Sequence, residues 1–376
     1  MNRSKYLEAV GVIVGTVVGL GIFSIPYAGR LGGVWPGVVL ILLLAAIMVT
    51  ISFLFAEIIV FSGKNGQGLV FYANKYIGKW AGKMVFCSIF IGYTGSLVAY
   101  ILAITVFVSS MFGLGKDFFW PIILFLTAIN SLVLLKGVRS LGRLEFFLSI
   151  FMVISFLVIL FSGVFFWEPI ESNWSYFLLP YGVIWFALTG ESAIPIAIKI
   201  LERKRKKIKS VIIVSYSIIV LVTVAFFVNA IKVGDGSLKP DPFLTMSEKM
   251  GDWVNYLGSA LSIVAVITSF WVAATYLKKI LEEDIAISQI ISWLTVIFLP
   301  LALIFIGVNN FIKVISLIGI LMGTVDSLII VSIYSKIFRN KRSKPKILPF
   351  RVPVIFLILL EILLISAAVS SLMMLE

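Results

Sequence analysis

Long runs of hydrophobic residues alternate with short polar segments along the whole chain. Most runs reach about 20 residues, the length that a helix needs to cross the hydrocarbon core of a bilayer. The residue-by-residue alternation typical of a membrane β-barrel does not occur in these runs. The pattern therefore predicts an all-α integral membrane protein with about eleven transmembrane helices. The predicted spans are 7–31, 36–62, 82–112, 118–136, 144–167, 174–200, 210–231, 254–280, 286–307, 312–337 and 349–373.

The composition supports a membrane environment and limits the kinds of chemistry that the chain can carry out. Hydrophobic residues make up 61% of the 376 residues, charged residues only 13%, and the mean hydropathy is +1.12. The chain has no histidine and a single cysteine, Cys87, which removes imidazole proton relays, thiolate metal sites and disulfides. No phosphate-binding glycine motif occurs in a strand–helix context. We expect neither an enzyme nor an ATP-driven pump, and no cofactor apart from a coupling ion.

Lysine and arginine are distributed unevenly between the two sets of polar segments. If the N-terminus is cytoplasmic, the outside segments hold six of the 31 Lys and Arg residues, and the inside segments hold the other 25. The six are Arg30, Lys116, Lys232, Lys239, Lys249 and Lys313. The positive-inside rule then predicts a multi-pass protein of the plasma (inner) membrane, with its N-terminus in the cytoplasm and its C-terminus outside. The basic run ERKRKKIK, 202–209, is expected to face anionic lipid rather than nucleic acid.

Two spans share an interrupted pattern, G-x-x-x-I-P. It occurs at 21–26 and again at 190–195, 169 residues apart, in the first and sixth spans. Glycine leaves helical dihedrals cheaply, and proline removes a backbone donor, so both spans are expected to break. Backbone groups freed inside a membrane need a ligand, an ion or water. Chance kinks are the alternative, but breaks at matching positions of two halves are typical of the binding site of a secondary transporter.

The matching breaks also predict the domain organisation. Five spans per half is an odd number, so the second half would be inverted relative to the first. The first repeat would cover 1–169 and the inverted second repeat 170–340, with an additional helix in 341–376.

Three segments carry a resemblance to a known family. They are GTVVGLGIFSIP (15–26), LPYGVIWFALTGESAIPI (179–196) and AVITSFWVAATYLKKILEEDI (265–285). With them the chain resembles permeases of the amino acid–polyamine–organocation superfamily, most closely the amino acid/auxin and aromatic amino acid branches. The resemblance implies the 5+5 inverted-repeat (LeuT-like) fold, with broken helices 1 and 6.

The resemblance also implies a substrate site between the broken helices. The substrate carboxylate would meet backbone N–H groups of the first break, and the substrate ammonium would meet carbonyls that end the first half-helices. Trp185 and Phe186 would form an aromatic gate, although simple packing is an equal alternative. The residues so implied are Val17, Gly19, Leu20, Gly21, Trp185, Phe186, Thr189 and Gly190.

Glu191 places a carboxyl group in the middle of the sixth span. Such groups are costly in a membrane and are usually functional. Three roles remain open, namely proton coupling, contact with a substrate cation, and a structural hydrogen bond that holds the broken helix.

The eighth span offers oxygen ligands for a coupling ion. In sodium-coupled relatives the pattern Ala265-x-x-Thr268-Ser269 supplies one carbonyl and two hydroxyls to Na⁺, and the resemblance adds the carbonyls of Gly15 and Val18. Neutral oxygens suit a hard cation, but Thr and Ser also serve as ordinary interhelical hydrogen bonders. In some proton-coupled relatives a lysine of the fifth span fills this cavity. The absence of such a lysine here favours Na⁺ over H⁺.

Other polar residues lie within the spans. Glu57 is expected in water or paired near the cytoplasmic end of the second span, and Glu361 is expected in a packing or dimer contact. A structural bond is favoured for Asp326 over contact with the pathway. Tyr93 and Tyr100 are seven residues apart and share a helix face, where core packing is the default.

These observations predict a secondary active transporter that imports an L-amino acid by ion-coupled symport and alternating access. A neutral amino acid is favoured, because Glu191 is the only candidate for an acidic side-chain pocket. Two alternatives stay open. One is an amino-acid sensor of the same fold that does not transport, like the germinant-receptor subunits of spore formers. The other is a polyamine or nucleobase permease.

Overall fold

The computed structural model describes the chain except for residues 1–2, 64–66, 137–141, 203, 235–236, 284–285, 340–344, 349–350 and 374–376. Within this part all regular structure is helical, and no strand occurs. Short 3₁₀ helices lie at Lys116–Phe118, Val164–Phe166 and Trp174–Tyr176. The α-helices are α1 (Arg3–Val17), α2 (Leu20–Gly29), α3 (Val34–Ser62), α4 (Leu69–Tyr76), α5 (Lys79–Phe112), α6 (Phe119–Lys136), α7 (Gly142–Gly163), α8 (Tyr181–Leu188), α9 (Ala193–Ile200), α10 (Arg205–Gly234), α11 (Pro242–Met250), α12 (Asp252–Glu283), α13 (Gln289–Phe305), α14 (Phe311–Phe338) and α15 (Val354–Met373).

The predicted spans coincide with these helices. By length and composition, seven helical segments of the described chain could cross a membrane, or eight if the bent pair α1–α2 is one span. Shorter apolar helices lie in α7, α13 and α15, where the fifth, ninth and eleventh spans are predicted. The all-helical membrane architecture expected from the hydrophobic pattern is therefore confirmed.

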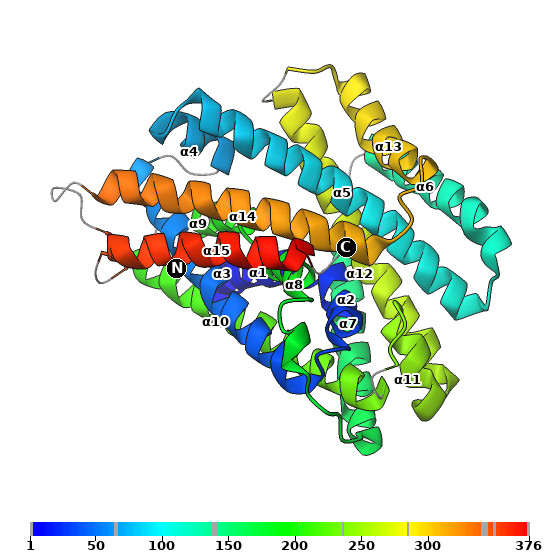
Figure 1. The fold of residues 1–376 in the computed structure, drawn as a ribbon. Coiled ribbons are helices and arrows are strands. Elements are labelled where there is room, and N and C mark those ends of the chain that lie inside the picture. The colour runs from blue at the N-terminus through cyan, green and yellow to red at the C-terminus, as the bar shows by residue number, and fades with distance from the viewer. Residues whose placement is uncertain are drawn as a thin grey trace.

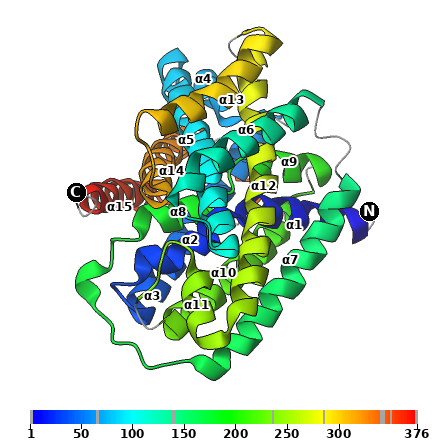
Figure 2. The same ribbon diagram turned by 90° about the vertical axis from the view of Figure 1, so that its right-hand side faces the viewer.

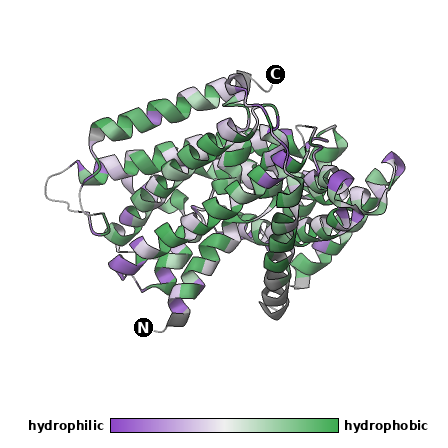
Figure 3. Ribbon diagram, turned by 90° about the horizontal axis from the view of Figure 1, so that it is seen from below, coloured by the Kyte–Doolittle hydropathy of each residue, from purple (hydrophilic) through white to green (hydrophobic). Residues whose placement is uncertain are grey.

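Hydrophobic side chains cover the outside of the molecule as well as its core. Figure 3 shows hydrophobic residues along most of the helices, with hydrophilic residues mainly toward helix ends and connections. Large apolar side chains such as Trp80, Phe165 and Phe305 are 80%, 87% and 77% exposed. So much exposed apolar surface would associate or aggregate in water, and it fits the hydrocarbon core of a membrane.

The helices pack in two groups that meet at α14. In one group, α3 packs along α10, α1 contacts α9 and α10, and α2 contacts α8. In the other, α5 packs along α12 and also contacts α4 and α13. The helix α14 contacts both α5 and α8, and α15 lies along its outer side (Figures 1 and 2). The broken helices thus belong to the first group, and α8 faces α14.

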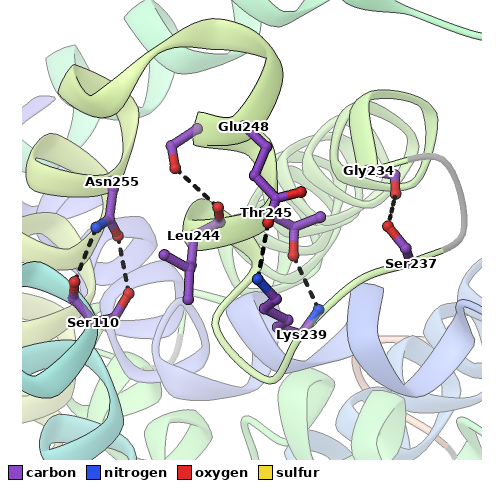
Figure 4. A network of polar contacts seen from close by, with 9 residues as sticks. Ser110, Gly234, Ser237, Lys239, Leu244, Thr245, Glu248 and Asn255 are labelled. Atoms are coloured by element: carbon purple, nitrogen blue, oxygen red, sulfur yellow. Dashed lines mark hydrogen bonds and ion pairs between the residues drawn. The ribbon is translucent and has the colours of Figure 1, made fainter. Parts of the chain in front are cut away.

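A polar network fixes the connection from α10 to α12 (Figure 4). The Lys239 backbone N–H donates to Thr245 Oγ1 over 3.0 Å, and Lys239 Nζ pairs with Glu248 at 2.8 Å. Ser110 of α5 and Asn255 of α12 exchange two hydrogen bonds of 3.0 Å. The connection contains the helix α11, which the hydrophobic pattern does not predict because it is short and amphipathic. The Ser110–Asn255 hydrogen bonds join α5 to α12, and the Lys239 contacts order the segment between α10 and α11.

Glu57 has a structural partner. Its side chain is fully buried. Of the two sequence-based alternatives, exposure to water is therefore wrong. Its carboxylate accepts backbone N–H groups of Lys346 (2.9 Å), Ile347 (2.5 Å) and Leu348 (2.6 Å). The carboxylate therefore attaches the segment before α15 to the end of α3.

Candidate functional site

The first span is broken between α1 and α2. Val18 and Gly19 lie outside both helices, whose axes differ by 46°. Pro26 lies two turns into α2, so the break itself falls at Val18–Gly19 rather than at the proline. The first N–H groups of a helix generally lack partners within the helix, and of those in α2 the Ile22 N–H donates to the Gly19 carbonyl over 3.3 Å. The structure thus places Gly19, Leu20 and Gly21 where free backbone donors occur.

The sixth span is broken between α8 and α9. Thr189, Gly190, Glu191 and Ser192 connect the two helices, and Pro195 falls in the first turn of α9, where proline is tolerated. Thr189 Oγ1 donates to the Trp185 carbonyl over 2.9 Å. The C-terminal carbonyls of α8 and the N–H groups of α9 therefore meet in this short segment.

The two breaks lie against each other. A Cβ atom on Gly190 would come within 2.8 Å of Val17 Cγ2. A Cβ atom on Gly21 would come within 2.5 Å of the Ala187 Cα atom, closer than real Cβ atoms approach. Glycine at Gly21 thus lets the backbones of the two broken spans pack directly together, and glycine at Gly190 leaves room for the Val17 side chain.

Tyr216 of α10 supports the second break, a role that the sequence did not suggest. Its hydroxyl accepts a hydrogen bond from Ser52 Oγ over 3.1 Å and lies 3.5 Å from the Leu188 carbonyl. The same hydroxyl would be 3.1 Å from a Cβ atom on Gly190. An isolated tyrosine in an apolar helix gave no signal for this contact, because the contact depends on the packing of α10 against α3 and α8.

The aromatic pair of α8 faces α14. Trp185 is fully buried, and its ring occupies the space over Gly323. Its ring centroid is 5.6 Å from that of Tyr181. Phe186 is half-buried, and its Cβ atom lies 3.0 Å from the position of a Cβ atom on Gly319. Trp185 thus fills the α8–α14 contact, and Phe186 is the more accessible of the two.

The candidate ion ligands of α12 lie beside the first break. A Cβ atom on Gly19 would approach Ser269 Oγ to 2.8 Å. The hydroxyls of Thr268 and Ser269 donate to the Ala265 carbonyl over 3.0 and 2.9 Å, so their oxygen lone pairs stay free for a cation. On the α1 side, Val18 is half-buried, and Gly15 is exposed with open space around it. The structure brings together Gly19 and Ser269, while Gly15 borders an open space.

Glu191, between α8 and α9, and Asp326 on α14 are both buried carboxyl groups. Their side chains are 8% and 3% exposed. Glu191 Oε1 and Asp326 Oδ1 have no hydrogen-bond partner among the described residues. The sequence identified both acids, in the sixth and tenth spans.

Two broken spans that pack against each other are a recurrent feature of membrane transporters. The family of transmembrane amino acid transporter proteins matches residues 2–375, and the chain belongs to this family. No curated protein matches the chain. Among solved structures, a manganese transporter from Eremococcus coleocola, in complex with an aromatic bis-isothiourea substituted compound, is similar with a TM-score of 0.70. At 11% identity the similarity covers 99% of this chain and 88% of that transporter, and it shows a shared fold.

Proposed function

We propose that this protein imports an L-amino acid, with a neutral one favoured, by ion-coupled symport and alternating access. The observation that carries the proposal is the direct packing of the two breaks, Gly190 on Val17 and Gly21 on Ala187. This packing places the start of α2 beside the carbonyl end of α8. Such a site suits a zwitterion, because helix N-termini attract a carboxylate and helix C-termini attract an ammonium group.

The hydroxyls beside the first break support Na⁺ over H⁺ as the driving ion. The Ser269 hydroxyl offers a neutral oxygen next to Gly19, and the Thr268 hydroxyl lies on the same helix. The carbonyls of Gly15, Val18 and Ala265 would complete the set, although the Ala265 carbonyl accepts hydrogen bonds from both hydroxyls in this structure. A hard monovalent cation takes oxygen ligands of this kind. Membership of an amino acid transporter family supports the substrate class.

The proposed setting is the plasma (inner) membrane, with a cytoplasmic N-terminus and an external C-terminus. The repeat boundaries expected from the sequence remain part of the proposal, with α1 to α7 in the first repeat, α8 to α14 in the second and α15 outside both.

The test is uptake of a labelled amino-acid mixture into proteoliposomes that contain the purified protein. An inward Na⁺ gradient, an inward H⁺ gradient and no gradient are compared, with protein-free liposomes as the control. Accumulation under the Na⁺ gradient is the expected result. Binding in a thermal-shift assay without uptake under any gradient would contradict transport and support a sensor.

A further inference from the structure

A hollow apolar groove lies between α3 and α10 on the outer surface of the molecule. Its volume is about 560 Å³, and it is lined by residues between Leu42 and Val49 of α3 and between Ile213 and Val224 of α10. Leu42 and Ile213 are exposed, so the groove is open to the outside. The short side chain of Ala46 helps to keep it hollow. In a membrane, such an apolar hollow suits an apolar ligand better than water.

The groove runs along the helices and has the length of one lipid leaflet. Between Ile213 and Val224 the axis of α10 rises about 16 Å, at 1.5 Å per residue. Half of the hydrocarbon core of a bilayer is about 15 Å thick. The groove therefore offers an apolar surface along which a single acyl chain of one leaflet can lie.

Two lysines continue the same face of α10 beyond one end of the groove. Lys209 and Lys206 lie four and seven residues before Ile213, so all three residues share a helix face. Both lysines are exposed, and within the described chain neither forms an ion pair with a carboxylate. The sequence predicts only a general attraction between the run 202–209 and anionic lipid. The structure adds a groove that is aligned with two lysines of this run.

The wall of the groove also contacts the break in the sixth span. Tyr216 lines the groove, although its side chain is only 1% exposed. Its hydroxyl accepts a hydrogen bond from Ser52 and lies 3.5 Å from the Leu188 carbonyl, which ends α8. A ligand that fills the groove restricts this ring, and the ring in turn supports the carbonyl end of α8.

We propose that the groove binds an anionic phospholipid of the leaflet that borders the start of α10, which is expected to be the cytoplasmic leaflet. One acyl chain lies between α3 and α10, against Ala46 and Tyr216, and the phosphate meets Lys206 and Lys209. The bound lipid stabilises the break between α8 and α9 through Tyr216. This lipid site does not depend on the proposed transport activity.

Native mass spectrometry of the purified full-length protein in detergent measures the binding. The protein is titrated with phosphatidylglycerol or with phosphatidylcholine that carries the same acyl chains. We expect a first phosphatidylglycerol to bind at about tenfold lower concentration, because two lysines attract its net negative charge. Equal binding of the two lipids by the wild-type protein would overturn the assignment of the anionic headgroup.

A charge variant tests which lysines meet the phosphate. The double variant Lys206→Gln/Lys209→Gln should lose the preference for phosphatidylglycerol. Lys336→Gln/Arg339→Gln is the matched control, since it removes two exposed basic residues, also three apart, from the end of α14. An unchanged preference in the Lys206/Lys209 variant, or an equal loss in the control, would overturn the site.

A filled groove tests the position of the acyl chain. Ala46→Phe should weaken the binding of both lipids about tenfold, because the acyl chain can no longer bury its surface there. Leu43→Phe adds bulk to an exposed position of α3 outside the groove and should bind as wild type. Ser217→Phe fills the groove from α10 and replaces Ala46→Phe if that variant does not fold. Unchanged binding in a folded groove variant would place the lipid elsewhere.

Hydrogen exchange tests the link to the break. In nanodiscs, amides of 188–192 should exchange more slowly in phosphatidylglycerol than in phosphatidylcholine, and Lys206→Gln/Lys209→Gln should remove this difference. Equal exchange of the wild-type protein in both lipids would overturn the support of the break by the lipid. None of these measurements uses transport, so a protein that fails in the uptake assay contradicts the proposed function and leaves the lipid site standing.

Discussion

At the scale of single residues, the contact between the two broken spans depends on glycines that leave room for close packing rather than on reactive side chains. Gly21 and Gly190 lie where the two broken spans touch, and neither position has room for a side chain without displacement of its neighbour. Gly11 and Gly15 on α1 have open space around them instead. Glycines that look alike in the sequence therefore differ in whether the packing of the helices requires them.

Gly21→Ala is expected to destabilise the protein by about 1–3 kcal/mol and to reduce uptake strongly, because its new Cβ atom would overlap the Ala187 backbone. Thermal unfolding and proteoliposome uptake measure both effects. Gly11→Ala is the matched control, since a Cβ atom there meets nothing within 4 Å. Equal behaviour of the two variants would contradict the packed contact of the breaks.

Thr268→Ala is expected to raise the half-saturating Na⁺ concentration for uptake by about tenfold or more, because it removes one of the few proposed oxygen ligands. The measurement is the half-saturating Na⁺ concentration. Thr295→Ala on α13 is the control, because the Thr295 hydroxyl makes the same kind of bond to its own helix, donating to the Ile291 carbonyl over 2.8 Å. Unchanged Na⁺ dependence in Thr268→Ala would show that the ion site lies elsewhere.

At the scale of helices, the broken and terminal elements are held by a few polar contacts. The carboxylate of Glu57 on α3 accepts three backbone N–H groups from the segment before α15. At the other end of the chain, Lys5 of α1 pairs with Glu202, which follows α9, and Tyr6 bonds Ser210 of α10 over 2.7 Å. These contacts join α3 to the segment before α15, and α1 to α10 and to the segment after α9.

Glu57→Gln is expected to cost about 2 kcal/mol, because the amide nitrogen would face backbone N–H groups and the charge-assisted bonds would be lost. Hydrogen exchange at 346–348 should accelerate, and the melting temperature should fall. Glu8→Gln, which changes an exposed side chain on α1, should leave both unchanged. Unaltered exchange in Glu57→Gln would contradict the role of this carboxylate.

Acidification is expected to loosen the start of α1. The hydrogen bond from Lys5 lowers the pKa of Glu202 below its ordinary value. A depressed carboxyl pKa stabilises the folded state above the unfolded-state pKa, and this contribution is lost as the pH falls through the folded-state pKa. Hydrogen exchange in α1 should therefore increase at acid pH in wild type.

Glu202→Gln should show the looser α1 already at neutral pH and should lose this acid response. Glu248→Gln, which removes an ion pair with Lys239 far from α1, should behave as wild type. An identical acid response in Glu202→Gln would show that another group controls α1.

At the scale of the whole molecule, one chain forms two helix groups joined by α14. The distribution of Lys and Arg sets the expected orientation of this assembly in the bilayer. Single cysteines in a Cys87→Ser background test it. With a membrane-impermeant maleimide on intact cells, Ser237→Cys should label and Lys206→Cys should label only after permeabilisation. The reverse pattern would contradict the cytoplasmic N-terminus.

The sequence by itself determined the membrane class, the approximate number of spans and which two spans are broken. The length of an apolar run matches the thickness of the bilayer, and Gly and Pro change the local backbone conformation. Both signals are local, so spans and breaks can be predicted without knowledge of tertiary contacts. The family resemblance followed from the same local segments, since 15–26 and 179–196 contain both breaks.

Only the tertiary structure decided which distant groups meet. Tyr216 supports the second break, and Glu57 holds the segment before α15. Each contact joins residues far apart along the chain, and a polar residue in an apolar helix looks the same whether it packs, pairs or binds a ligand. The packing of α10 and α14 on the broken spans makes that choice, because it alone sets the distances between their side chains.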